Sequence, residues 1–194
     1  IGIEFMKKLR EGVSTGSCMT GGAEASVIWQ TTGKCPSVVK VDTPIGKTLY
    51  LDIIPREFGV CGVVKDAGDD PDVTNGSEIV TKVELFEEEG DIFFFGGEGV
   101  GTITQEGLKI PPGQPAINPV PRQMAEKAIR KIIGNKKASV TVSIPGGKEL
   151  AKKTFNPRLG IVDGLSVLGT TGIVRPMSEE AMKDSLIAEL DMLS

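Results

Sequence analysis

Apolar runs of strand length dominate the first half of the chain and predict β-strands. The runs are Val38–Val41, Thr48–Ile54, Val60–Val64, Ile79–Phe86 and Ile92–Phe95. Pro44 and Gly46 lie between the first two runs, so we expect these two to form an antiparallel hairpin. The last run is apolar without interruption, which is typical of a buried strand.

Helical patterns are strongest in two other segments. Residues 14–30 are rich in small side chains and predict a helix capped by Thr15 or Ser17. Two interpretations of these small side chains stay open: close approach to a ligand, and tight packing against a sheet. A second helix, Arg122–Ile133, begins after Pro121 and carries an apolar stripe along one face.

The rest of the chain adds one strand, two helices and two long loops. Ala138–Ile144 predicts a strand, whereas Gly146–Lys153 and Ser178–Leu193 predict helices. Glycine and proline crowd the segments 96–121 and 156–176. Because strands come early and helices late, we expect an α+β fold. In it, helices pack on a mixed, largely antiparallel sheet, and Gly/Pro-rich loops join the elements.

The composition narrows the classes of function. The chain has 194 residues and no histidine, which excludes Ser-His-Asp and Cys-His catalysis and zinc held by imidazole. A net charge of −4 argues against a nucleic-acid partner. The absence of an apolar segment of about 18 residues argues against a membrane span. Three cysteines without Cys-x-x-Cys spacing, and no apolar signal segment, predict a cytoplasmic protein with free thiols.

Four carboxylates follow one predicted strand within a short segment: Asp66, Asp69, Asp70 and Asp72. Crowded carboxylates repel one another unless a cation, a proton or solvent relieves them. The segment is compatible with a solvated turn, a metal site, or a loop that orients substrate or acts as a general base. Its spacing does not match a calcium loop, and we predict no protein-bound metal. Asp66, Asp69 and Asp70 are the catalytic candidates.

A glycine-rich segment follows the apolar run Ile92–Phe95. A strand that runs into glycines exposes backbone amides to an anion or a cofactor. The candidate cofactor-binding residues are therefore Gly97, Glu98, Gly99, Gly101 and Thr102. A simple hairpin turn is the alternative. Pro111 and Pro112 preclude the helix that a dinucleotide-binding fingerprint requires.

Polar and basic side chains also come from stiff or glycine-rich backbone. Arginine side chains there suit carboxylates and phosphates, because the guanidinium group donates paired hydrogen bonds. The candidate substrate-binding residues are Thr15, Ser17, Arg122, Asn156, Arg158 and Arg175. A solvated basic face is an equally good explanation for the neighbouring Lys152 and Lys153. From the residues alone, we expect a domain that binds a small anionic ligand.

Taken together, these segments resemble the CbiD family of the anaerobic cobalamin pathway. The acidic string Asp66-Ala-Gly-Asp69-Asp70-Pro-Asp72 is one of the matching motifs. The matching strings are Leu9–Cys18, Cys61–Thr74, Gly97–Thr102, Pro115–Arg122, Lys153–Ile161 and Leu168–Met177. In this order they span nearly the whole chain from Leu9 onward.

The resemblance implies transfer of a methyl group from S-adenosylmethionine to ring carbon C-1 of cobalt-precorrin-5B, giving cobalt-precorrin-6A. Cobalt then belongs to the tetrapyrrole substrate and not to the protein. The acetate and propionate arms of such a substrate suit Arg122, Arg158 and Arg175 as clamps. Alignment of the donor with the acceptor carbon is expected to supply much of the rate.

Members of the CbiD family continue well beyond the length of this chain. The resemblance therefore implies that residues 1–177 form an N-terminal α+β domain and that the predicted helix 178–194 leads to a C-terminal domain. Residues 1–5, ahead of Met6, are interpreted as an extension that is not native. Two alternatives to an enzyme follow: a non-catalytic corrinoid- or anion-binding module, and a structural partner domain. The partners expected besides the tetrapyrrole are a second copy of the chain or a C-terminal partner chain.

Overall fold

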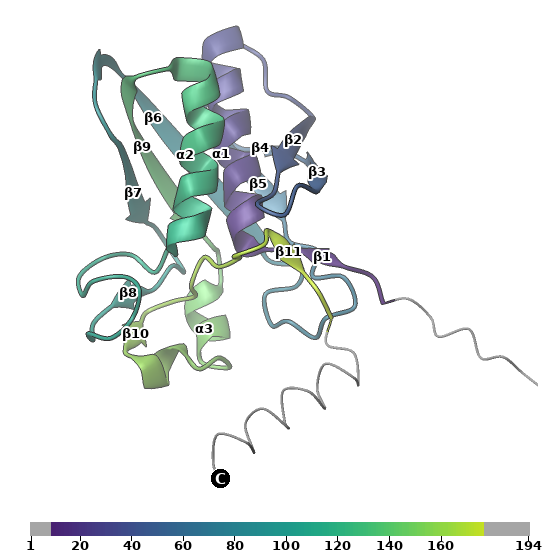
Figure 1. Cartoon of the computed structure of the whole chain (residues 1–194), viewed down its shortest axis with the longest axis vertical. Helices are drawn as coiled ribbons and strands as arrows, with labels where there is room; N and C mark the ends of the chain where they lie inside the picture. Colours follow the sequence, from purple (N-terminus) through teal and green to yellow (C-terminus); the bar gives the residue numbers. More distant parts are fainter. Residues whose placement is uncertain (1–8, 177–194) are drawn as a thin grey trace, which may run out of the picture.

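The computed structural model describes residues 9–176 and has a five-stranded sheet at its centre (Figure 1). The predicted helix Ser178–Leu193 and residues 1–5 lie outside the described residues. In sheet order the strands are β4 Ile54–Pro55, β5 Val60–Val64, β6 Glu78–Glu89, β9 Lys136–Ser143 and β7 Ile92–Gly96. Neighbouring strands are antiparallel except β7 and β9, which are parallel. The predicted α+β fold with a mixed, largely antiparallel sheet is confirmed.

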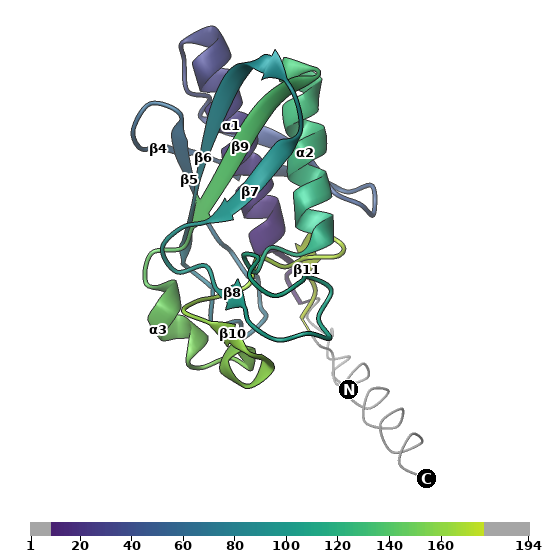
Figure 2. The ribbon, with the colours of Figure 1, turned by 90° about the vertical axis from the view of Figure 1, so that its left-hand side faces the viewer.

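Two long helices cover one face of this sheet. Figure 2 shows β6, β9 and β7 in front, with α1 Thr15–Thr32 and α2 Pro119–Ile133 behind them. The side chains between helices and sheet form the core. Its largest fully buried members include Met19, Val27, Ile79, Ile129, Val140 and Val142.

The small residues of α1 allow the helix to lie close to its neighbours. A Cβ atom at Gly21 would lie 2.9 Å from Leu51 Cδ1, and one at Gly22 would lie 3.0 Å from Thr81 Oγ1. Tight packing is therefore the correct one of the two interpretations for this part of the helix. The predicted cap was wrong, because Ser14 and not Thr15 or Ser17 caps α1. The Ser14 backbone is extended, so its side-chain oxygen reaches back and accepts a hydrogen bond from Ser17 N.

The predicted hairpin forms as expected. Strands β2 Val38–Asp42 and β3 Thr48–Asp52 pair antiparallel, with Val38 opposite Asp52. The run Thr48–Ile54, however, is not one strand. It divides between β3 in this hairpin and β4 in the large sheet, because the chain changes sheets near Ile53.

Strand β7 is a half-exposed edge strand, so the prediction of a buried strand over Ile92–Phe95 was wrong. Ile92 and Phe94 point inward, whereas Phe93 and Phe95 are 46% and 52% exposed. The reason is that the two helices cover a single face of the sheet, so alternate side chains of this apolar run face outward. A strand's own sequence does not show whether its second face is covered.

A smaller set of short elements lies at one end of the sheet (Figure 1). It contains the strand pairs β1 Gly12–Val13 with β11 Ile173–Val174, and β8 Thr102–Ile103 with β10 Ile161–Val162. It also contains α3 Gly147–Ala151 and the 3-10 helix η1 Asn156–Leu159. No helix between residues 9 and 176 is long and apolar enough to cross a membrane.

Candidate functional site

A cavity of about 470 Å³ lies where the start of α1 meets three loops from other parts of the chain. We call it the Lys65 cavity. Its lining comes from the start of α1, from residues 65 and 72–74, from 154–159 and from 165–174. The fold thus gathers at one place segments that are more than 100 residues apart in the sequence.

Lys65 supplies a buried positive charge to this cavity. Its side chain is 4% exposed, and among residues 9–176 it is the only charged residue that is buried. The ammonium group donates to Asp72 Oδ2 and to Thr74 Oγ1, both at 2.5 Å. A lysine ammonium group has three hydrogens to donate, so one remains for a ligand.

Asp72 balances this charge. Burial alone would raise the pKa of Asp72, but hydrogen bonds from Lys65, the Thr74 hydroxyl and Thr74 N outweigh burial, so the pKa is lowered. Asp72 is therefore ionised at neutral pH and holds Lys65 in its charged form. The result is a fixed, partly satisfied cation inside a cavity.

Apolar side chains surround this cation. Phe155, Leu159, Leu168 and Val73 line the cavity although each is substantially exposed, with Phe155 at 73%. Exposed apolar side chains that cluster around a cavity mark a binding surface. The cavity therefore suits a large, mainly apolar ligand that carries an anionic group.

Among the predicted substrate-binding residues, Thr15 and Asn156 line the Lys65 cavity. Thr15 Oγ1 donates to Leu168 O and accepts from Leu168 N, while Asn156 Nδ2 donates to Gly164 O and Ser166 Oγ. Both side chains therefore hold the loops that shape the cavity.

Ser17 is fully buried and donates to Gly172 O at 2.8 Å. Further carbonyl groups of the 168–172 loop accept from Gly16 N and Ser14 N. The loop thus covers the start of α1, whose amides would otherwise attract an anion. Ser17 positions this loop and does not line the cavity.

The predicted catalytic aspartates lie outside the Lys65 cavity. Asp66 accepts from both terminal nitrogens of Arg10 at 2.6 and 2.9 Å, and Asp69 accepts from Arg10 N at 2.5 Å. The hydrogen bonds from Arg10 and then from Gly68 N lower the pKa of Asp66. A lowered pKa makes a carboxylate a poorer general base at neutral pH. Asp70 is half-buried and lines none of the cavities described here.

The predicted cofactor-binding segment 97–102 is packed against other backbone. Gly97 N donates to Val142 O, and Gly101 N donates to Leu165 O. A Cβ atom at Gly99 would lie only 1.8 Å from Ile144 O. Gly97, Glu98, Gly99, Gly101 and Thr102 therefore lie at a crowded junction and line neither the Lys65 cavity nor the cavities that contain Arg122 and Glu24.

The three predicted arginine clamps are not brought together. Arg122 donates to Ile117 O and Pro115 O, lies over the Phe94 ring and lines a separate cavity of about 400 Å³. Arg158 lies on η1, next to Leu159 of the Lys65 cavity. Arg175 pairs with Glu11 at 3.4 Å. Arg122 thus anchors the 115–117 backbone, while Arg158 and Arg175 lie beside residues of the Lys65 cavity.

Sequence reasoning missed the two charged residues at the centre of the site, Lys65 and Asp72. One signal could have found Lys65. Cys61 and Val63 of β5 are buried, and Lys65 continues the same alternation just past the end of the strand. Among residues 9–176 there is no group of three or more Cys, Asp or Glu side chains that could hold a metal ion.

The fold and this cavity define an α+β domain that encloses a partly satisfied cation within an apolar surface. Comparison with known proteins gives the family. The CbiD family profile matches residues 3–176, and the chain belongs to this family. The chain is 51% identical to the cobalt-precorrin-5B C(1)-methyltransferase of Thermoanaerobacter sp. over 97% of this chain and 52% of the relative. It is 47% identical to the enzyme of the same name from Methanocaldococcus jannaschii, over 97% of this chain and 54% of the relative.

A solved structure supports the same fold. The chain resembles the crystal structure of the cobalamin biosynthesis protein cbiD from Archaeoglobus fulgidus, with a TM-score of 0.69 and 32% identity. The match covers 92% of this chain and 59% of the solved chain. The chain thus spans little more than half the length of the relatives it matches.

Proposed function

We propose that this chain takes part in the S-adenosylmethionine-dependent methylation of C-1 of cobalt-precorrin-5B, and that the Lys65 cavity binds the tetrapyrrole substrate. The family and the names of its relatives support the reaction. The observation that carries the binding site is the buried Lys65 ammonium group, which has one donor to spare within an apolar rim.

The chemistry of the substrate fits this surface. A tetrapyrrole has a broad apolar ring and carboxylate arms at its edge. In the proposed complex, Lys65 donates a hydrogen bond to one carboxylate, and Phe155, Leu159 and Leu168 contact the ring. Arg158 and Arg175 lie beside the cavity and contact further carboxylate arms. Cobalt enters as part of the substrate.

The role of these residues is to bind and orient the acceptor carbon. S-adenosylmethionine supplies an electrophilic methyl group when it is bound. Transfer of that group is an in-line displacement, whose rate depends strongly on the alignment of donor and acceptor. A fixed Lys65, held by Asp72 and Thr74, sets one edge of the macrocycle in a single position. Asp66, Asp69 and Asp70 stay proposed proton-handling groups that would act at the edge of the site.

The first experiment is a titration of the 194-residue chain with cobalt-precorrin-5B. Lys65→Met is expected to weaken binding 10- to 100-fold, since a hydrogen bond to a charged group contributes about 1.5–3 kcal/mol. Lys82→Met is the matched control, because Lys82 is 53% exposed on β6 and pairs only with Glu84. Thermal unfolding of each variant checks that it is folded. Equal affinity of the wild type and a folded Lys65→Met variant would contradict the proposed site.

A further inference from the structure

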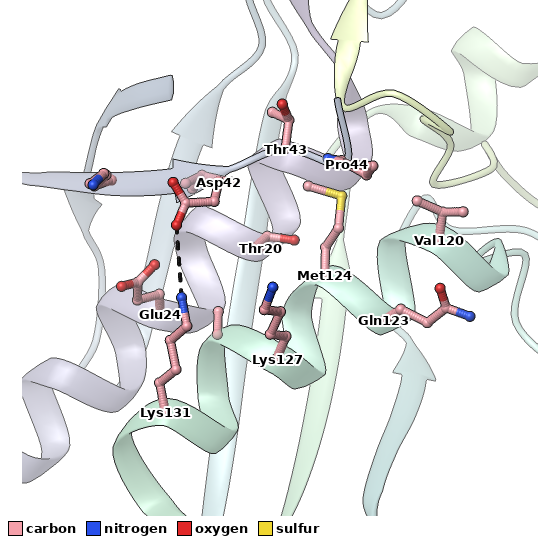
Figure 3. A pocket seen from close by; sticks show the side chains of 13 residues that line it. Thr20, Glu24, Asp42, Thr43, Pro44, Val120, Gln123, Met124, Lys127 and Lys131 are labelled. Carbon is pink, nitrogen blue, oxygen red and sulfur yellow. Dashed lines mark ion pairs between the residues drawn. The ribbon is translucent and has the colours of Figure 1, made fainter. Parts of the chain in front are cut away.

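A second cavity, of about 290 Å³, lies between α1, α2 and β2 (Figure 3). We call it the Glu24 cavity. It shares no lining residue with the Lys65 cavity. Its floor includes the buried side chains of Val41 and Met124, and it is too small for a tetrapyrrole. It lies near the lower limit of about 300 Å³ for small-molecule pockets.

Charges of both signs face this cavity from opposing elements. Figure 3 shows Lys127 and Lys131 extending from α2 toward Glu24 on α1 and Asp42 on β2. Lys131 pairs with Asp42 at 3.8 Å. Within the described part of the chain, neither Glu24 nor Lys127 has a hydrogen bond or an ion pair closer than 4 Å.

Glu24 is the more unusual of these two groups. Its carboxyl is half-buried, and burial raises its pKa, with a smaller opposing effect from Lys131 and a reinforcing one from Asp42. A half-buried carboxylate without a hydrogen-bond donor is energetically unfavourable. A ligand with a cationic donor would relieve Glu24, and an anionic group on the same ligand would pair with Lys127.

The position of the Glu24 cavity relative to the Lys65 cavity is also informative. Thr170 and Thr171 line the Lys65 cavity, and Thr43 lines the Glu24 cavity. Gly172 joins the two, since a Cβ atom there would lie 2.9 Å from Thr43 Cγ2. One loop, 169–172, therefore separates the two cavities, so their ligands would lie on either side of it.

We propose that the Glu24 cavity binds the amino-acid end of the methyl donor. In this arrangement Glu24 accepts hydrogen bonds from the α-ammonium group, Lys127 donates to the α-carboxylate, and Met124 contacts the apolar chain. This proposal rests on the proposed function, because it takes the donor to be S-adenosylmethionine. It assigns to the donor a site separate from the tetrapyrrole site.

Three nucleoside probes test the proposal by calorimetric titration of the full chain. S-adenosylmethionine and S-adenosylhomocysteine both carry the amino-acid end, whereas 5′-methylthioadenosine lacks it. We expect the first two to bind with similar affinity and 5′-methylthioadenosine to bind at least tenfold more weakly. Equal binding of all three probes, or no binding of S-adenosylmethionine at millimolar concentration, would overturn the proposal.

Variants locate the binding. Glu24→Gln and Lys127→Met are each expected to weaken S-adenosylmethionine binding about five- to tenfold and to leave 5′-methylthioadenosine binding unchanged. Glu126→Gln is the matched control on α2, because Glu126 is exposed and does not line the cavity. Unchanged affinity in both cavity variants would overturn the proposal. So would loss of donor binding in Lys65→Met, which would place the donor in the Lys65 cavity.

The tetrapyrrole titration separates failure of this proposal from failure of the proposed function. If cobalt-precorrin-5B binds and S-adenosylmethionine does not bind in the Glu24 cavity, the assignment of the donor site is wrong and tetrapyrrole binding stands. If neither ligand binds a folded chain, both proposals are wrong.

Discussion

Lys65 and Asp72 form the interaction with the largest expected energetic consequence in the Lys65 cavity. Removing one partner of a buried ion pair leaves the other charge without compensation, which costs more than the pair itself contributes. Lys65 is almost fully buried, whereas the Asp72 side chain is 25% exposed. Loss of Asp72 therefore affects stability more than loss of an exposed carboxylate such as Asp66, whose pairing with Arg10 is at the surface.

At this scale we predict the effect of Asp72→Asn on stability. The variant keeps the shape of the side chain but leaves the Lys65 ammonium group without its counter-charge. We expect the free energy of unfolding to fall by about 3 kcal/mol, measured by urea denaturation at pH 7. Asp70→Asn, two residues away, is the control and is expected to change stability by less than about 0.5 kcal/mol. Similar values for the two variants would show that the pair is not important for stability.

The glycine-rich segment after β7 shows how an element can suggest a function that its packing explains differently. Residues 97–101 form hydrogen bonds with β9 and with the 164–165 backbone, and Gly99 lies against Ile144 O. Gly99 also has a positive φ of +77°. Glycine is required here because a side chain would be both strained and blocked by another segment of backbone.

We therefore predict that Gly99→Ala destabilises the fold. The added Cβ atom has to displace the Ile144 carbonyl group, so we expect a loss of about 3 kcal/mol or more in the free energy of unfolding. Gly107→Ala separates strain from crowding, because Gly107 has a φ of +96° and no atom within 4 Å of its would-be Cβ. That control is expected to cost about 1 kcal/mol. If the two substitutions cost the same, close packing is not the reason for Gly99.

For the whole molecule, acid stability follows from the carboxylates that are hydrogen-bonded in the folded state. The pKa values of Asp66 and Asp72 are both lowered on folding. Below the ordinary carboxyl pKa of about 4, the unfolded chain therefore binds more protons than the folded one. The stabilisation is complete above that pH and decreases as the pH falls toward the folded-state values.

We predict that the urea midpoint is constant from pH 7 to 5 and decreases below about pH 4. Asp72→Asn should show a shallower decrease than the wild type, because it lacks one of the two titrating groups. Unfolding curves at pH 7, 5, 4 and 3 provide the measurement. A midpoint that does not change between pH 5 and pH 3 would contradict the assigned hydrogen bonds.

Much of the fold could be predicted because local patterns carry it. The hairpin Val38–Asp52 depends on a turn between two apolar runs, and α2 depends on an apolar stripe after Pro121. The errors concern longer-range facts. The open face of β7 and the division of Thr48–Ile54 between two sheets depend on which elements cover each strand, and local sequence does not encode that.

The sequence by itself determined the class of fold, the positions of the main elements and the resemblance to the CbiD family, because these depend on periodicity and on motifs contiguous in the chain. Only the tertiary structure decided which candidates share a site. It placed Lys65 and Asp72 beside Thr15 and Asn156, and placed Asp66 and the 97–102 segment elsewhere. The physical reason is that a binding site requires charges and apolar surfaces to meet in space. Such meetings are set by how the loops pack at the end of the sheet.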